Sequence, residues 1–162
     1  MCIRDSVNSG GADIKGLELE INAMLTDRLN IRLAGDVNDT KVTQAEEFSS
    51  TLKGSELIFA PDHSASIAID YSLPLENGWR VDFHLDRSWV AKQFVNSQNS
   101  LEIPSFERSN GRVTLHSPDE KWRIALYGTN LEDDEILRGR TATGNLFWHS
   151  PRQIGLEVGY QL

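Results

Sequence analysis

The chain has 162 residues, a formal net charge of −8 and a hydrophobic content of 39%. This length suits one ordinary domain, and the acidic balance argues against nucleic-acid binding, which usually requires a basic face. No run of 18 apolar residues occurs in the sequence, so no transmembrane helix is predicted. The low hydrophobic content does not exclude a membrane-spanning β-barrel, because such a barrel shows lipid only every second residue.

Residues 1–8 are expected to be a leader that is either disordered or foreign to the protein. The opening stretch MCIRDSVNSGG has no apolar core, so it does not have the form of a secretory signal peptide. Its first six residues resemble the translated linker remnants found at the ends of some assembled environmental sequences. The single cysteine, Cys2, cannot form a disulfide within the chain.

In several segments after residue 8, apolar side chains recur at every second position, which is the pattern of a β-strand with two unlike faces. The pattern appears seven times, in IKGLELEINAM (14–24), LNIRLAGDVND (29–39), SASIAIDY (64–71), WRVDFHLD (79–86), NGRVTLH (110–116), WRIALYG (122–128) and QIGLEVGYQL (153–162). No segment carries the apolar stripe of a helix, and LEDDEIL (131–137) would form one turn at most. We therefore predict an all-β fold of about seven long strands.

The connections between these strands alternate in length. Short ones lie around Thr26–Arg28 and in LPLENG (73–78) and SPDEK (117–121), and long ones lie at about 41–62, 91–107 and 131–150. In an antiparallel up-and-down meander this alternation gathers the short turns at one end and the long loops at the other. That asymmetry is typical of outer-membrane barrels, with short periplasmic turns and longer external loops.

Five aromatic residues on the apolar parity are predicted to lie at the membrane interfaces. Tyr71, Trp79, Trp122 and Tyr160 fall near the short turns, and Trp89 follows Trp79 by ten residues along one strand. With a strand tilt near 40°, that separation is roughly 25 Å along the membrane normal, the height of the apolar band of a barrel. A sandwich core would place aromatics near strand middles as often as at strand ends.

The opposite parity is charged. Its members include Glu18, Glu20, Arg32, Asp36, Arg80, Asp82, Arg112, Arg123 and Glu157. Such a face suits the wet lumen of a large barrel, whereas a barrel of eight strands would hold it only as a packed ion-pair network.

Three stretches resemble motifs of the TonB-dependent receptors. GSELIFAPDHSASIAIDYSLP (54–74) resembles the loop that ends in "aP" before a strand, YGTNLEDDE (127–135) resembles "gxNLxD", and SPRQIGLEVGYQL (150–162) resembles the "PR" start of the final strand. The resemblance covers residues 9–162 and implies the C-terminal part of a 22-stranded transmembrane β-barrel. The plug domain, the segment that contacts TonB and the signal peptide would then lie upstream.

The same resemblance gives the last strand a second role, as the signal read by the barrel-assembly machinery. Its alternating residues are Ile154, Leu156, Val158, Tyr160 and Leu162. Leu162 stands where the family usually has phenylalanine. A closing strand that must face lipid would show the same alternation, and both interpretations stand together.

The function implied by the resemblance is uptake of a scarce solute across the Gram-negative outer membrane, driven through TonB. Iron-siderophore complexes, cobalamin and oligosaccharides are the solute classes implied. The lipid bilayer, the barrel-assembly machinery and TonB, the last through the missing N-terminal parts, are the implied partners. Candidate ligand-facing residues in the long loops are Phe94, Arg138, Arg140, Phe147 and Trp148.

No enzyme, metal site or cofactor is predicted. The four histidines, His63, His84, His116 and His149, show no metal-ligand spacing, and no phosphate loop or G-x-S-x-G motif is present. The acidic run Glu132–Glu135 is interpreted as a solvated loop.

Two alternatives remain open at this point. One is a complete small barrel of eight strands with a structural or adhesive role, which would use GNLFWHS (144–150) as an additional strand. The other is a soluble β-sandwich module that binds carbohydrate.

Overall fold

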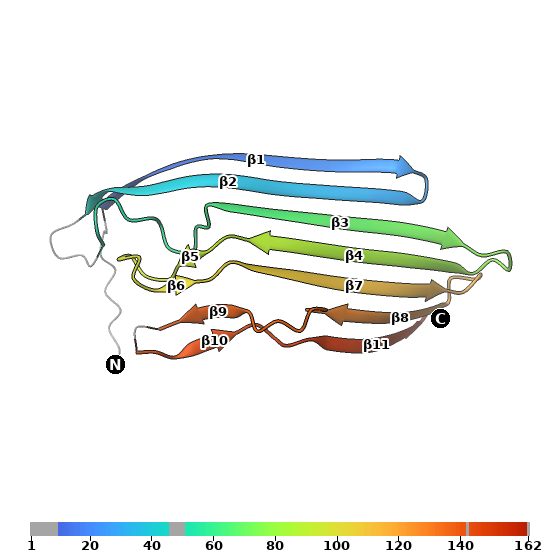
Figure 1. Cartoon of the computed structure of the whole chain (residues 1–162). Helices are drawn as coiled ribbons and strands as arrows, with labels where there is room; N and C mark the ends of the chain where they lie inside the picture. The colour runs from blue at the N-terminus through green and yellow to red at the C-terminus, as the bar shows by residue number, and fades with distance from the viewer. Residues whose placement is uncertain (1–9, 46–50, 142, 162) are drawn as a thin grey trace.

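Seven strands lie side by side in one antiparallel sheet, each hydrogen-bonded to the strand that precedes it in the meander (Figure 1). The computed structural model describes residues 10–45, 51–141 and 143–161, and no helix occurs among them. The strands of the sheet, in order, are β1 (Gly10–Thr26), β2 (Leu29–Ala45), β3 (His63–Pro74), β4 (Arg80–Val90), β7 (Phe106–His116), β8 (Trp122–Thr129) and β11 (Gln153–Tyr160). The prediction of an all-β meander of seven strands is confirmed.

The alternation of short and long connections is also confirmed. The three short turns lie at one end of the sheet, here called the turn end, and the long connections lie at the other, the loop end (Figure 1). Two of the long connections carry small hairpins that the sequence pattern did not reveal: β5 (Gln93–Phe94) pairs with β6 (Glu102–Ile103), and β9 (Leu137–Arg140) pairs with β10 (Leu146–Trp148).

Two loop boundaries differ from the prediction. Strand β2 continues to Ala45, so residues 41–45 belong to the sheet, and β7 begins at Phe106 rather than after residue 107. The first difference arises because this stretch pairs with Gly10–Asp13 at the start of β1. The following loop folds back on it: the Val42 amide donates to the Ser55 carbonyl, and the Gly54 amide donates to the Val42 carbonyl, both at 2.8 Å. Val42 is only 5% exposed beneath this loop.

The segment that the eight-stranded alternative requires does not join the sheet. Leu146–Trp148 forms β10, whose partner is β9 in a separate two-stranded sheet at the loop end. Within the described residues, none belongs to a helix long and apolar enough to span a membrane.

The sheet has two chemically distinct faces because its register keeps like residues together. The apolar face carries large side chains that remain exposed, with Leu17 at 75%, Leu156 at 69% and Val37 at 62%. Ladder partners on this face include Ile31, Ile69 and Leu85 in three adjacent strands. The adjacent residues Arg32, Asp70 and His84 lie on the other face, here called the charged face. Asp70 is the ladder partner of His84, and Arg32 forms an ion pair with Asp70. An apolar surface of this extent requires a non-aqueous neighbour.

A charged side chain on the apolar face is expected to destabilise the folded protein in a membrane. In the protein that carries this chain, Ile69→Arg should destabilise folding into a phospholipid bilayer by about 2–4 kcal/mol, because the guanidinium would enter the middle of the apolar band. The matched control is Ser66→Arg, which lies on the charged face opposite Ala34 and Ser88 and should cost far less. Denaturant unfolding from lipid vesicles measures both, and equal effects would contradict the assignment of the faces.

Candidate functional site

The charged face carries several groups of ion pairs that join neighbouring strands. Near its centre the Arg32 guanidinium lies 2.9 Å from Asp70, and the Nδ1 atom of His84 lies 2.7 Å from the other oxygen of that carboxylate. At the turn end, Arg80 contacts both Asp82 on its own strand, at 3.2 Å, and Glu120 in the turn after β7, at 2.8 Å. Each pair is partly exposed, so each contributes little stability alone.

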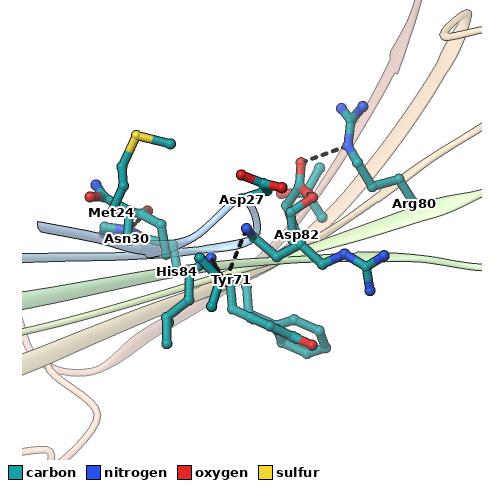
Figure 2. A pocket seen from close by; sticks show the side chains of 14 residues that line it. Met24, Asp27, Asn30, Tyr71, Arg80, Asp82 and His84 are labelled. Carbon is teal, nitrogen blue, oxygen red and sulfur yellow. Dashed lines mark hydrogen bonds and ion pairs between the residues drawn. The ribbon is translucent and has the colours of Figure 1, made fainter.

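A hollow of about 460 Å³ opens on the charged face at the turn end. Figure 2 shows Arg80 and Asp82 beside each other on its lining, with Met24, Asp27 and Asn30 from the first hairpin. Every charged side chain of the β4 part of this lining already has an ionic partner, so the hollow offers an incoming ligand no unpaired charge there.

Another group of ion pairs lies at the β11 edge of the sheet. Glu157 of β11 accepts from Arg112 of β7 at 2.9 Å and from Arg123 of β8 at 2.5 Å. The Arg112 guanidinium also lies 5.8 Å from the centre of the Tyr127 ring. That ring lies across Gly155, where a Cβ would overlap it. The glycine in QIGLEVG therefore makes room for an aromatic side chain on the charged face.

The two motifs NLED (130–133) and PR (151–152) form one structural unit, here called the clasp. Asn130 is 2% exposed, and its side-chain amide donates to the Asp134 carbonyl at 2.9 Å and to the Ser150 carbonyl at 3.3 Å. Asp133 accepts from the Arg152 amide at 3.0 Å and from its guanidinium at 3.2 Å. The clasp thus fixes where β8 ends and where β11 begins.

The acidic run Glu132–Glu135 is exposed, as the interpretation of a solvated loop requires, but its first two members also make specific contacts. Glu132 accepts from the Ser109 amide at 3.0 Å and lies 3.3 Å from Arg87, while Asp133 is part of the clasp. The hydrogen bonds from Ser109 hold the pKa of the Glu132 carboxyl below its usual value. Among the described residues, no group of three or more histidine, cysteine, aspartate or glutamate side chains is arranged to hold a metal ion.

The loop end of the charged face carries a different kind of hollow, with a volume of about 430 Å³. Its lining includes Arg108, Asn110, Tyr127, His149 and Gln153, from β7, β8, the loop end and β11. Burial lowers the pKa of the His149 imidazole, and the positive charges of Arg108 and Arg138 lower it further.

The predicted interface aromatics lie where the prediction put them along the strands. Tyr71, Trp122 and Tyr160 are exposed at the turn end, and the rings of Trp122 and Tyr160 are 4.7 Å apart across β8 and β11. Trp79 directly precedes β4, and Trp89 lies near the opposite end of that strand. Their contact with a membrane interface stays a prediction.

The predicted ligand-facing residues fall into two groups at the loop end. Phe94 belongs to β5, with the Lys92 ammonium 5.1 Å from its ring, whereas Arg138, Arg140, Phe147 and Trp148 belong to the β9–β10 hairpin. The structure leaves Phe147 and Trp148 about half exposed.

Reasoning from the sequence missed two members of the loop-end hollow, Arg108 and His149. Arg108 has the parity of the charged face, but its strand partner is Ser88 rather than a carboxylate. That register is not visible in a single sequence. His149 had no distinctive spacing to single it out.

The residues of the predicted assembly signal share the apolar face of β11. Ile154, Leu156, Val158 and Tyr160 are 50–70% exposed, and Leu162 lies outside the described residues. Recognition by the assembly machinery stays a prediction.

An antiparallel meander with one exposed apolar face and one ion-paired face, with short turns at one end and folded loops at the other, defines a segment of a transmembrane β-barrel. A protein-family model described as TonB dependent receptor-like, beta-barrel matches residues 4–131. The chain belongs to this family of outer-membrane receptors.

Individual relatives agree with the family. The chain is 24% identical over 161 residues to the ferrioxamine receptor of Yersinia enterocolitica and 28% identical over 161 residues to the ferric-pyoverdine M114 receptor PbuA of Pseudomonas sp. (strain M114). These alignments cover 95% and 94% of the chain, but only 21% and 19% of the relatives. The chain therefore spans about a fifth of the length of these curated relatives.

A solved structure shows the same fold. The ferric yersiniabactin uptake receptor FyuA from Yersinia pestis superposes on 94% of the chain with a TM-score of 0.81 at 17% sequence identity. The match covers 24% of that receptor.

The clasp is expected to matter for stability. Asn130→Ala should lower the free energy of unfolding by about 1–3 kcal/mol, because it removes the hydrogen bonds from this buried side chain to the Asp134 and Ser150 carbonyls. Asn22→Ala, on the exposed charged face of β1, is the matched control and should change stability by less than about 0.5 kcal/mol. Equilibrium denaturation of the intact receptor measures both, and an unchanged Asn130→Ala variant would show that the clasp is dispensable.

Proposed function

We propose that the chain forms part of the barrel of a TonB-dependent transporter that takes up a ferric siderophore across the Gram-negative outer membrane. The observation that carries this proposal is the exposed apolar face backed by an ion-paired face, in a chain that belongs to the receptor family. The two curated relatives are named for ferrioxamine and ferric pyoverdine. That favours a siderophore over cobalamin or an oligosaccharide.

Each part of the sheet then has a role. The apolar face contacts lipid, with Tyr71, Trp79, Trp122 and Tyr160 at the periplasmic interface and Trp89 at the external one. The charged face lines the lumen, and the loop end faces outward with the ligand-facing residues Phe94, Arg138, Arg140, Phe147 and Trp148. TonB acts through parts of the receptor outside this chain, and no chemical reaction is assigned to it.

The two outer strands support membership in a larger barrel. Within the described residues, β1 pairs only with β2 and β11 pairs only with β8, so each has one edge without a strand partner. Open sheet edges are not tolerated in the hydrocarbon of a bilayer, because their amide and carbonyl groups would lack hydrogen bonds. In the proposed receptor, further strands pair with both edges and close the barrel.

The proposal is tested by recovering the gene with its flanking DNA and expressing it in a Gram-negative host that lacks its own siderophore receptors. We expect an open reading frame that continues upstream into a plug domain, and uptake of radioactive iron supplied as a siderophore complex only in cells with functional TonB. A matched host without TonB is the control. A stop codon and promoter directly before codon 1, or uptake that is independent of TonB, would overturn the proposal.

The role of β11 as an assembly signal gives a separate expectation. Tyr160→Ala removes the ring that contacts Trp122 and an aromatic residue of the predicted signal, so the amount of folded receptor in the outer membrane should fall several-fold. Gln161→Ala is the control, since this residue lies on the opposite parity of the same segment. Heat-modifiable electrophoretic mobility of membrane fractions reports the folded amount. Equal amounts of folded receptor for the two variants would show that Tyr160 is not part of the assembly signal.

A further inference from the structure

Buried apolar side chains lie near the β2–β3 and β4–β7 connections at the loop end. Val42 is 5% exposed, Ala91 is 8% exposed and Ile103 is 1% exposed. Mobile loops have few buried apolar contacts, so this burial indicates that the two connections are packed. Further parts of the receptor can only add to the burial, so the observation does not depend on what lies outside the chain.

The described part of the β2–β3 connection is tied to β2. Besides the two bonds that join Val42 to Gly54 and Ser55, the Leu57 amide donates to the Thr40 hydroxyl at 3.1 Å. Thr40 is itself buried. Residues 54–57 are therefore held against a strand of the sheet along their length.

The same segment is tied to the β4–β7 connection through one asparagine. The Glu56 amide donates to the Oδ1 atom of Asn99 at 2.6 Å, and the Nδ2 atom of Asn99 donates to the Glu56 carbonyl at 3.1 Å. One side chain thus satisfies both backbone groups of one residue, as a partner strand would. Further along, the Phe59 amide donates to the Phe94 carbonyl at 2.9 Å, where the β2–β3 connection runs beside β5 (Figure 1). These bonds join two connections that are distant in the sequence.

The β5–β6 hairpin holds Asn99 in the position that this contact requires. Asn99 has a φ of 51°, in the left-handed region that asparagine adopts more readily than most residues. Its amide donates to the Asn96 carbonyl at 3.1 Å, and the Asn96 side chain accepts from the amides of Ser100 and Leu101 at 3.1 and 3.0 Å. The Val95 amide donates to the Leu101 carbonyl at 3.0 Å. The turn that carries Asn99 is therefore fixed by its own hydrogen bonds.

We propose that the β2–β3 and β4–β7 connections form one cooperative body, in which Asn99 is the positioning residue that couples them. Opening of either connection breaks the bonds at Glu56 and Phe59, so the other connection loses the contacts that hold it closed. The two connections therefore open together rather than as separate flaps. This inference goes beyond the proposed function, because it concerns motion at the loop end and holds for any transported solute.

The test is hydrogen–deuterium exchange of the full-length receptor in detergent, read by mass spectrometry with fragmentation that resolves single amides. Asn99→Gly removes the side chain but keeps the left-handed backbone, which glycine adopts without steric cost. With independent loops, the β2–β3 connection would lose protection only at the Glu56 amide. With one cooperative body, exchange should also become at least tenfold faster at the Phe59 amide, which does not bond to Asn99.

The reciprocal variant acts from the other connection. Thr40→Val removes the hydroxyl that accepts from Leu57 and keeps the shape of the side chain. Exchange should become faster at the amides of Val95 and Asn99, although both donate within the β4–β7 connection. Asn99→Asp keeps the acceptor for the Glu56 amide and loses the donor, so its effect should lie between those of the wild type and Asn99→Gly.

Asn77→Gly is the matched control at the opposite end of the sheet. The Asn77 side chain accepts from the Trp79 amide at 3.3 Å in the turn between β3 and β4, so its loss should leave exchange in both connections unchanged. The ladder amides of β3 and β4 report whether each variant retains the sheet. Faster exchange that stays within the substituted connection, for Asn99→Gly or for Thr40→Val, would overturn the cooperative body.

Discussion

The structure depends on the register of its backbone ladder. Side chains alternate between the faces of a strand, so a slip of one residue would exchange the two faces along that entire strand. With the observed register, Ile31, Ile69 and Leu85 lie together on the apolar face, and the adjacent Arg32, Asp70 and His84 form ion pairs on the other. One register therefore gathers the apolar side chains on one face and also brings the ion-pair partners together on the other. A shift of one strand by an odd number of residues would turn these charged side chains to the apolar face and break their ion pairs.

The clasp extends the same constraint to the last strand. The connection before β11 is long and carries its own hairpin, so a tight turn cannot set the register there as it does at the turn end. Asn130 and the Asp133–Arg152 pair set the register instead, because they join the segment directly after β8 to the residues directly before β11. Glu132 adds a bond to β7. Two members of the exposed acidic run, Glu132 and Asp133, thus connect the segment after β8 to β7 and to the start of β11.

The sequence predicted the features that rest on a repeated period and missed those that depend on contacts between distant segments. Seven strands, their two faces and the alternation of turns and loops were all visible, because each rests on spacing within a few residues. The β5–β6 and β9–β10 hairpins were missed, since strands of two to four residues are too short to show a period. Residues 41–45 were assigned to a loop because their place in the sheet comes from pairing with Gly10–Asp13 of β1, which is distant in the sequence. Arg108 became distinctive only when the register placed Ser88 opposite it.

Net charge does not describe the local arrangement of charge in this chain. The overall balance is −8, yet each charged group interacts mainly with the groups within a Debye length, about 10 Å at moderate salt. Along the central and turn-end parts of the charged face, each arginine of the ladder has a carboxylate within 3.2 Å, so positive charge is neutralised strand by strand. At the loop end, the strand partner of Arg108 is Ser88 rather than a carboxylate, and the Arg108 Nε atom donates to no acceptor among the described residues. The location of paired charge is therefore set by the strand register, and composition alone conceals it.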